Sequence, residues 1–125
     1  MEASVQRTAA IADMNLGELQ ARALRASGLL KAMSNPVRLL VLCQLAEGEK
    51  SVGELERVVD VSQSALSQHL AILRQRGIVK FRREGQTLYY SLAGPEAPTL
   101  LAALYAVYCG NVRRAAARRR RRKSA

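Results

Sequence analysis

The sequence has no tryptophan, one histidine and two cysteines among its 125 residues. It also has no glycine-rich phosphate-binding loop and no acidic pair that suggests catalysis. A nucleophilic cysteine needs a histidine base beside it, and the single histidine, His69, lies in a polar helical segment that contains neither cysteine. These absences argue against an enzyme.

Long apolar runs are missing as well. No stretch approaches the roughly 18 apolar residues that a membrane span requires. Residues 1–13 lack the basic start and apolar run of a secretory signal. We therefore expect a cytoplasmic protein with no membrane partner. A static disulfide between Cys43 and Cys109 is not expected in that compartment, so the two thiols are either small packing residues or a reactive pair.

Positive charge is concentrated at the C-terminus. Residues 113–125 hold eight of the twenty basic side chains, and the rest of the chain carries twelve basic and ten acidic ones, a net charge of +2. A basic chain is a candidate for nucleic-acid binding, but a block of like charges is commonly disordered and solvated. We expect a disordered tail, which adds either attraction to phosphates or only solubility.

Hydrophobic periodicity divides the remaining chain into helices and one β-hairpin. A chain of this length favours one domain, which we place at residues 15–112, between a flexible arm at 1–14 and the tail. Alternating apolar residues on both sides of Gly85-Gln86 predict the hairpin, so the fold class is mainly α with a small β-hairpin. Helical spacing predicts helices over 15–33, 36–46, 53–59, 63–76 and about 95–111. The segment 36–46 is apolar almost all round, which is typical of a buried helix.

The centre of the chain is expected to read DNA. Helix, tight turn, helix and basic hairpin follow one another as in a winged helix-turn-helix. In the second of these helices, Leu66, Leu70 and Leu73 form an apolar stripe, and hydroxyl and amide side chains that can bond base edges fall on the other face. A plain polar surface helix would share that face, but the adjacent basic hairpin favours DNA binding. The predicted DNA-binding residues are Gln63, Ser64, Ser67 and Gln68 on the helix and Lys80, Arg82 and Arg83 on the hairpin.

Three stretches resemble the ArsR/SmtB family of winged-helix repressors. They are LKAMSNPVRLLVLCQL, VGELERVVDVSQSALSQHLAILRQRGIVKFRREGQTLYYSL and LYAVYC, within residues 16–110. SQSALSQHL is similar across the family, whereas a cysteine in both LVLCQL and LYAVYC resembles the persulfide- and polysulfide-sensing SqrR/BigR/HlyU-type subgroup. The resemblance implies a homodimer formed by the first and last helices. Such a dimer favours a palindromic operator in double-stranded DNA, with major grooves about 34–36 Å apart.

The resemblance also implies a redox switch made of Cys43 and Cys109, with no cofactor. A thiolate of lowered pKa attacks a persulfide or polysulfide sulfur, and the second cysteine resolves the adduct into a bridge of two or more sulfurs. A direct disulfide needs Cα atoms within about 7 Å, and a longer sulfur chain relaxes that limit. The implied effector is therefore a persulfide or polysulfide.

Metal sensing is the main alternative, because many members of that family sense metals. The sequence has no Cys-X-Cys or Cys-X-X-Cys, and the last predicted helix offers Glu96 as its only acid and no histidine. His69 lies among leucines, where we expect it to be partly buried. We therefore expect no metal site. A thiol-independent DNA-binding regulator and a basic protein that coats RNA remain as further alternatives.

Overall fold

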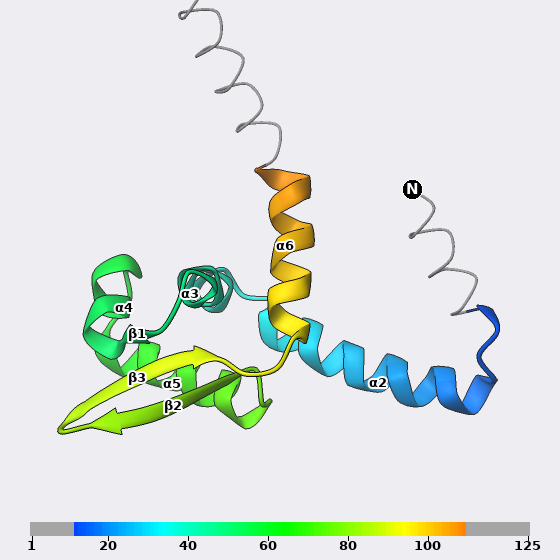
Figure 1. The fold of residues 1–125 in the computed structure, drawn as a ribbon, viewed down its shortest axis with the longest axis horizontal. Coiled ribbons are helices and arrows are strands. Elements are labelled where there is room, and N and C mark those ends of the chain that lie inside the picture. Colours follow the sequence, from blue (N-terminus) through cyan, green and yellow to red (C-terminus); the bar gives the residue numbers. More distant parts are fainter. Residues whose placement is uncertain (1–11, 110–125) are drawn as a thin grey trace, which may run out of the picture.

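The computed structural model describes residues 12–109, which form five helices and a three-stranded antiparallel sheet (Figure 1). The predicted order of helices and hairpin is confirmed, with boundaries that differ by a few residues. Most of the predicted arm (1–14) lies outside the described residues. The predicted tail (113–125) and the predicted end of the last helix lie wholly outside them. The elements are α2 (Leu16–Met33), α3 (Pro36–Ala46), β1 (Lys50–Ser51), α4 (Val52–Val58), α5 (Gln63–Gln75), β2 (Val79–Glu84), β3 (Thr87–Leu92) and α6 (Glu96–Tyr108).

Side-chain caps fix where α3 and α4 begin. The Asn35 side-chain oxygen accepts hydrogen bonds from the backbone N–H groups of Val37 and Arg38, at 2.9 and 3.1 Å. Before α4, Ser51 and Glu54 form a capping box in which each side chain accepts from the other's backbone N–H, at 3.1 and 3.2 Å. These bonds satisfy donors that the first turn of a helix leaves free, so both starting points are encoded locally.

The helix-turn-helix and the hairpin are also set by local signals. Ser62 caps α5 by accepting from the backbone N–H of Ala65 at 3.2 Å, and Gly77, with a φ of 71°, ends it. Gly85 has a φ of 63° at the first central position of the β2–β3 turn, as a type II′ hairpin turn requires. In the sheet, β3 lies between β1 and β2, so the hairpin is anchored beside α4.

The core lies between α3, α4, α5 and the sheet, with the start of α6 against it. α3 contributes Val41, Leu42 and Leu45, which are buried, but Leu40 is 40% exposed. Cys43 on the same helix is exposed as well. The prediction that α3 is buried on all sides is therefore wrong within one chain, because the described residues cover only one of its faces.

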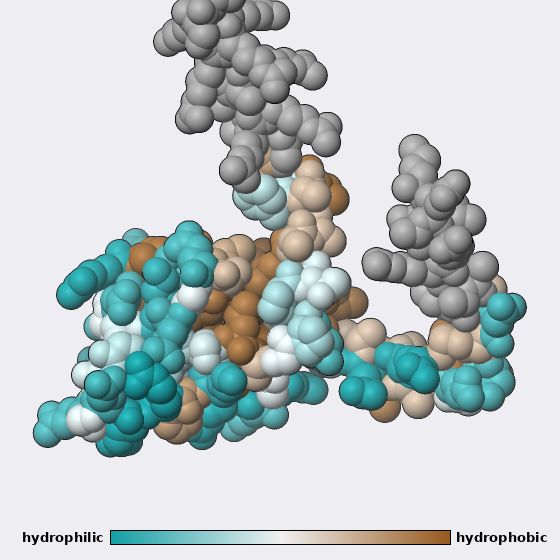
Figure 2. All heavy atoms as spheres, viewed as in Figure 1, coloured by the Kyte–Doolittle hydropathy of each residue, from teal (hydrophilic) through white to brown (hydrophobic). Residues whose placement is uncertain are grey.

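The two terminal helices carry apolar side chains that the rest of the described chain does not cover. In Figure 1, α2 extends away from the body and α6 rises beside α3. Figure 2 shows apolar residues gathered where α3 and α6 meet. No helix within residues 12–109 is both long and apolar enough to cross a membrane. The most exposed large apolar residues are Leu16 (69%), Leu24 (77%), Val107 (66%) and Tyr108 (75%).

Candidate functional site

The second helix of the helix-turn-helix, α5, presents two different faces. Leu66, Leu70 and Leu73 are at most 2% exposed and hold the helix against the core. The opposite face is open to solvent, so its hydroxyl and amide groups can meet another molecule, although the Ser64 hydroxyl also shares a hydrogen bond with the Ser62 hydroxyl at 3.2 Å. All four predicted base-reading residues are exposed there, namely Gln63, Ser64, Ser67 and Gln68.

A cleft of about 580 Å³ separates the start of α5 from the hairpin turn. Gln63 and Ser67 line it from α5, and Gln86 and Thr87 line it from the turn. The sequence predicted the place of the turn but not that its polar tip shares a cleft with α5. The candidate nucleic-acid interface therefore includes Gln86 and Thr87 as well as the predicted helix residues.

On the hairpin, Arg82 is already bound within the chain. Its guanidinium forms two hydrogen bonds to the Glu49 carboxylate, at 2.7 and 2.9 Å, and one to Glu84 at 2.8 Å. It also lies 4.5 Å from the ring centroid of Tyr89. The hydrogen bonds from Arg82 lower the pKa of Glu49. In return, the carboxylates of Glu49 and, to a smaller extent, Glu84 raise the pKa of Arg82. Because the guanidinium of Arg82 already contacts two carboxylates and an aromatic ring, its contacts stabilise the hairpin and leave less of its charge available to DNA.

The two other predicted hairpin cations have open charges. Lys80 and Arg83 are exposed, and neither takes part in the ion pairs formed within residues 12–109. Because side chains alternate across a strand, Lys80 and Arg82 share one face of β2 and Arg83 lies on the other. On that second face, Phe81 lies 5.6 Å from Tyr90 between ring centroids, and the Arg74 guanidinium lies 4.9 Å from Phe81. These contacts attach the hairpin to the end of α5.

The two cysteines lie on helices that pack together. Cys43 is on α3, and Cys109 caps the end of α6, where its backbone N–H donates to the Tyr105 carbonyl at 2.8 Å. Both thiols are free and exposed. Partial burial raises the pKa of Cys43, and the negative charge of Cys109 raises it further. The helices that carry them, α3 and α6, pack against each other. A thiolate of lowered pKa, as the resemblance implies, is therefore not Cys43.

No further metal-ligating side chains gather around the two thiols among the described residues. Within 12–109, no three histidine, cysteine, aspartate or glutamate side chains gather in a way that could hold a metal ion. Structural zinc takes four protein ligands, and the two thiols supply two.

Residues 35–80 match the family model for bacterial regulatory proteins of the arsR family. This segment runs from the cap of α3 to the start of β2 and so contains the helix-turn-helix. The transcriptional activator HlyU of Vibrio cholerae is 48% identical over 98 residues, which cover 78% of this chain and 91% of HlyU. The chain belongs to the ArsR family. A second relative of this ArsR-family chain, the biofilm growth-associated repressor of Agrobacterium fabrum, is 43% identical over 108 residues, or 86% of the chain and 92% of the relative.

Solved structures agree with this assignment. Reduced HlyU from Vibrio cholerae superimposes with a TM-score of 0.72 at 47% identity, over 75% of this ArsR-family chain and 99% of HlyU. The homodimeric winged helix-turn-helix DNA-binding domain of Mb0332 from Mycobacterium bovis gives a TM-score of 0.67 at 29% identity, over 81% and 93% of the two chains. This ArsR-family protein is thus a winged helix-turn-helix DNA-binding transcriptional regulator of the BigR/HlyU type.

Proposed function

We propose that this regulator represses transcription as a homodimer on a palindromic operator, and that reactive sulfur species release it by bridging Cys43 and Cys109. The observation that carries the proposal is the thiol pair. The chain has two cysteines, both are free and exposed, and the charge of one acts on the other. They also lie on two different helices, so a bridge would constrain how α3 and α6 pack.

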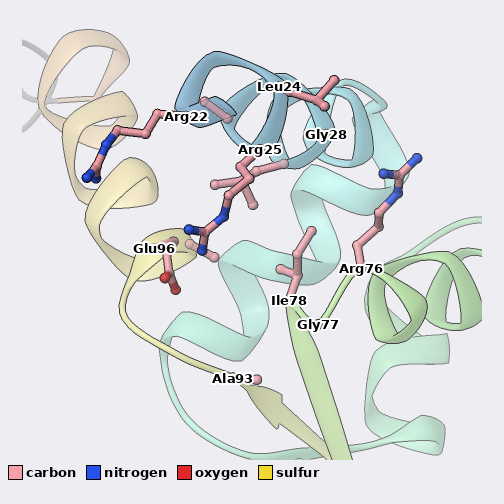
Figure 3. A pocket seen from close by; sticks show the side chains of 12 residues that line it. Arg22, Leu24, Arg25, Gly28, Arg76, Gly77, Ile78, Ala93 and Glu96 are labelled. Carbon is pink, nitrogen blue, oxygen red and sulfur yellow. The ribbon is translucent and has the colours of Figure 1, made fainter. Parts of the chain in front are cut away.

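The terminal helices supply the argument for a dimer. α2 and α6 expose apolar side chains that a second copy would bury. A cleft of about 650 Å³ lies between α2, the turn before β2 and the start of α6. Arg25 reaches across this cleft from α2 towards Glu96 of α6 (Figure 3). A two-fold dimer through these surfaces would present two copies of α5 to successive major grooves, and the structural relative Mb0332 is homodimeric.

On DNA, the two parts of the interface have different tasks. The exposed amides and hydroxyls of α5 read base edges, and an amide side chain can pair with adenine through two hydrogen bonds. Lys80 and Arg83, whose charges are open, contact phosphates and fix the position of the protein without reading sequence. Arg82 keeps the hairpin in place through Glu49 and Glu84. The tail over 113–125 lies outside the described residues and is proposed only as an additional phosphate contact.

The switch is thiol–polysulfide exchange. Because partial burial raises the pKa of Cys43 and so disfavours its thiolate, we assign the first attack to Cys109. Its thiolate attacks an inner sulfur of a polysulfide RS–S–S–SR, forms one S–S bond and expels RS⁻. Cys43 then loses its proton, attacks the next sulfur and expels the second RS⁻. The two cysteines are oxidised by two electrons, the polysulfide is reduced to two thiolates, and two sulfurs stay in the bridge.

A bridge affects DNA binding through the packing of α3 and α6. Well-packed helices do not deform continuously, so a covalent link shifts the chain towards another arrangement of its helices. Two copies of α5 that leave the operator spacing cannot both enter the major groove. To change occupancy from 99:1 to 1:99, the bridge must favour the non-binding arrangement by about 5.5 kcal/mol. The Vibrio cholerae relative HlyU is described in a reduced form, which fits a regulator whose thiol state matters.

The test compares Cys43→Ser and Cys109→Ser with the parent protein on operator DNA, before and after an organic polysulfide. Reduced samples of all three should bind equally, because neither cysteine lies on the DNA-reading face. After polysulfide, the parent should dissociate and both variants should stay bound. A variant that is released as readily as the parent would show that the two-cysteine switch is wrong, while DNA recognition would stand.

A further inference from the structure

One side chain outside the predicted site touches three helices. Arg38, in the first turn of α3, donates from Nε to the backbone carbonyl of Ala32 in the last turn of α2, at 2.6 Å. Its Nη1 lies 3.3 Å from Nδ1 of His69 on α5. Both contacts are partly buried. Arg38 thus joins the proposed dimer helix, the cysteine-bearing helix and the DNA-reading helix.

The chemistry of the contact with His69 is fixed by the arginine. A guanidinium has five N–H donors and no acceptor, so Nδ1 of His69 must accept and the ring is neutral, with its proton on Nε2. Burial and the nearby charge of Arg38 both lower the pKa of His69, in agreement with a neutral ring. His69 is half-buried, as the sequence predicted, but its partner 31 residues earlier was not foreseen.

The planar fork of arginine points its donors in fixed directions. A side chain that holds a carbonyl of α2 and a ring of α5 at once therefore restricts the placement of these two helices relative to each other. α2 extends away from the body in Figure 1, and it is buried only at its C-terminal end, through Ala32 and Met33. The Arg38 contacts are made at that end, where a small change of angle would be multiplied along the helix.

We propose that Arg38 is a positioning residue that sets the placement of α5 relative to α2, and so the separation of the two DNA-reading helices in the dimer. This inference rests on the proposed dimer and operator. Arg38 itself does not contact DNA in the proposed complex. It determines which spacing of half-sites the dimer accepts, through Ala32 on one side and His69 on the other.

The experiment measures spacing preference with the full chain. A palindromic operator is first selected by the parent protein from random duplex DNA, and its half-sites are then moved apart by one and by two base pairs. Binding to the three duplexes is measured for Arg38→Met, which removes both contacts, and for Arg38→Lys, which keeps the charge but not the fork. Lys31→Met is the control, because it removes one positive charge beside Ala32 without contacting α5.

The parent and Lys31→Met should prefer the selected spacing by about tenfold or more, a difference of about 1.4 kcal/mol. Arg38→Met and Arg38→Lys should bind the three duplexes with affinities within about threefold of one another. His69→Leu should behave like them, whereas His69→Asn, which keeps an acceptor near the position of Nδ1, should retain the preference. Thermal unfolding identifies any variant that does not fold. If Arg38→Met fails to fold, the spacing preferences of Arg38→Lys and His69→Leu test the proposal in its place.

Equal weakening on all three duplexes, with the preference intact, would overturn the inference and leave Arg38 a stabilising residue only. If the parent selects no operator, or selects one without two-fold symmetry, the proposed function fails first and this inference falls with it. The two failures are distinguishable. Failure of the proposed function appears in the parent protein, whereas failure of the inference about Arg38 appears only in the variants.

Discussion

Separate replacement of Arg82 and Arg83 by glutamine should distinguish support of the hairpin from contact with DNA. The charge of Arg82 is occupied by Glu49 and Glu84 at 2.7–2.9 Å, while Arg83 is exposed and outside the ion pairs of the described chain. Each phosphate contact contributes about 0.9 to the slope of log K against log salt. Because the dimer carries two copies of Arg83, Arg83→Gln should reduce that slope by about 1.8 units, and Arg82→Gln should leave it nearly unchanged.

The assay is fluorescence anisotropy with a labelled operator between about 50 and 200 mM salt. Over this fourfold range, one phosphate contact is worth a factor of about 3.5 in affinity, so with two contacts per dimer the parent should lose about 12-fold more affinity than Arg83→Gln. Glu49→Gln is the matched control, because it loosens Arg82 without removing it and should not lower the slope. A slope reduction of about 1.8 units in Arg82→Gln, as large as that expected for Arg83→Gln, would refute the assignment of Arg82 to hairpin support.

Three other outcomes follow from the site. Gln68→Ala should weaken operator binding by about 1–3 kcal/mol and random DNA less, and equal losses in a competition assay would reject base reading. Alkylation of Cys43 should have its midpoint at lower pH in Cys109→Ser than in the parent, because one cause of its raised pKa is removed, but still above the ordinary thiol value, because burial remains. His69 has a lowered pKa in the folded chain, so the unfolded chain binds more protons below about pH 6.5. The free energy of unfolding should fall as the pH drops through that region, and it should fall less in His69→Gln. Denaturant melts that give the parent and His69→Gln the same dependence of stability on pH would contradict this role of His69.

The elements of the fold could be predicted because their signals are local. Asn35 and Ser62 cap helices within three residues of themselves, and Gly85 sets a turn between two strands that pair with each other directly. Apolar spacing then identifies the buried face of α5. Each of these features depends on neighbours along the chain, which a single sequence displays.

The contacts that couple the elements could not be predicted in this way. Arg82 finds Glu49 across 33 residues and Arg38 finds His69 across 31, and a charge pattern does not show which distant partner a cation takes. The burial of α3 on all sides was wrongly predicted for a related reason. An apolar helix surface can be covered by its own chain or by another molecule, and the sequence pattern of α3 is the same in both cases.

In the proposed switch, a sulfur bridge between Cys43 and Cys109 empties the operator. Intact-protein and peptide mass spectrometry, made on the same samples as operator binding along a titration with polysulfide, tests it most directly. If the bridge releases the operator, the fraction of chains carrying a Cys43–Cys109 bridge with added sulfurs should rise in step with the fraction of operator released. Release without that bridge, or a fully bridged protein that still occupies the operator, would contradict it.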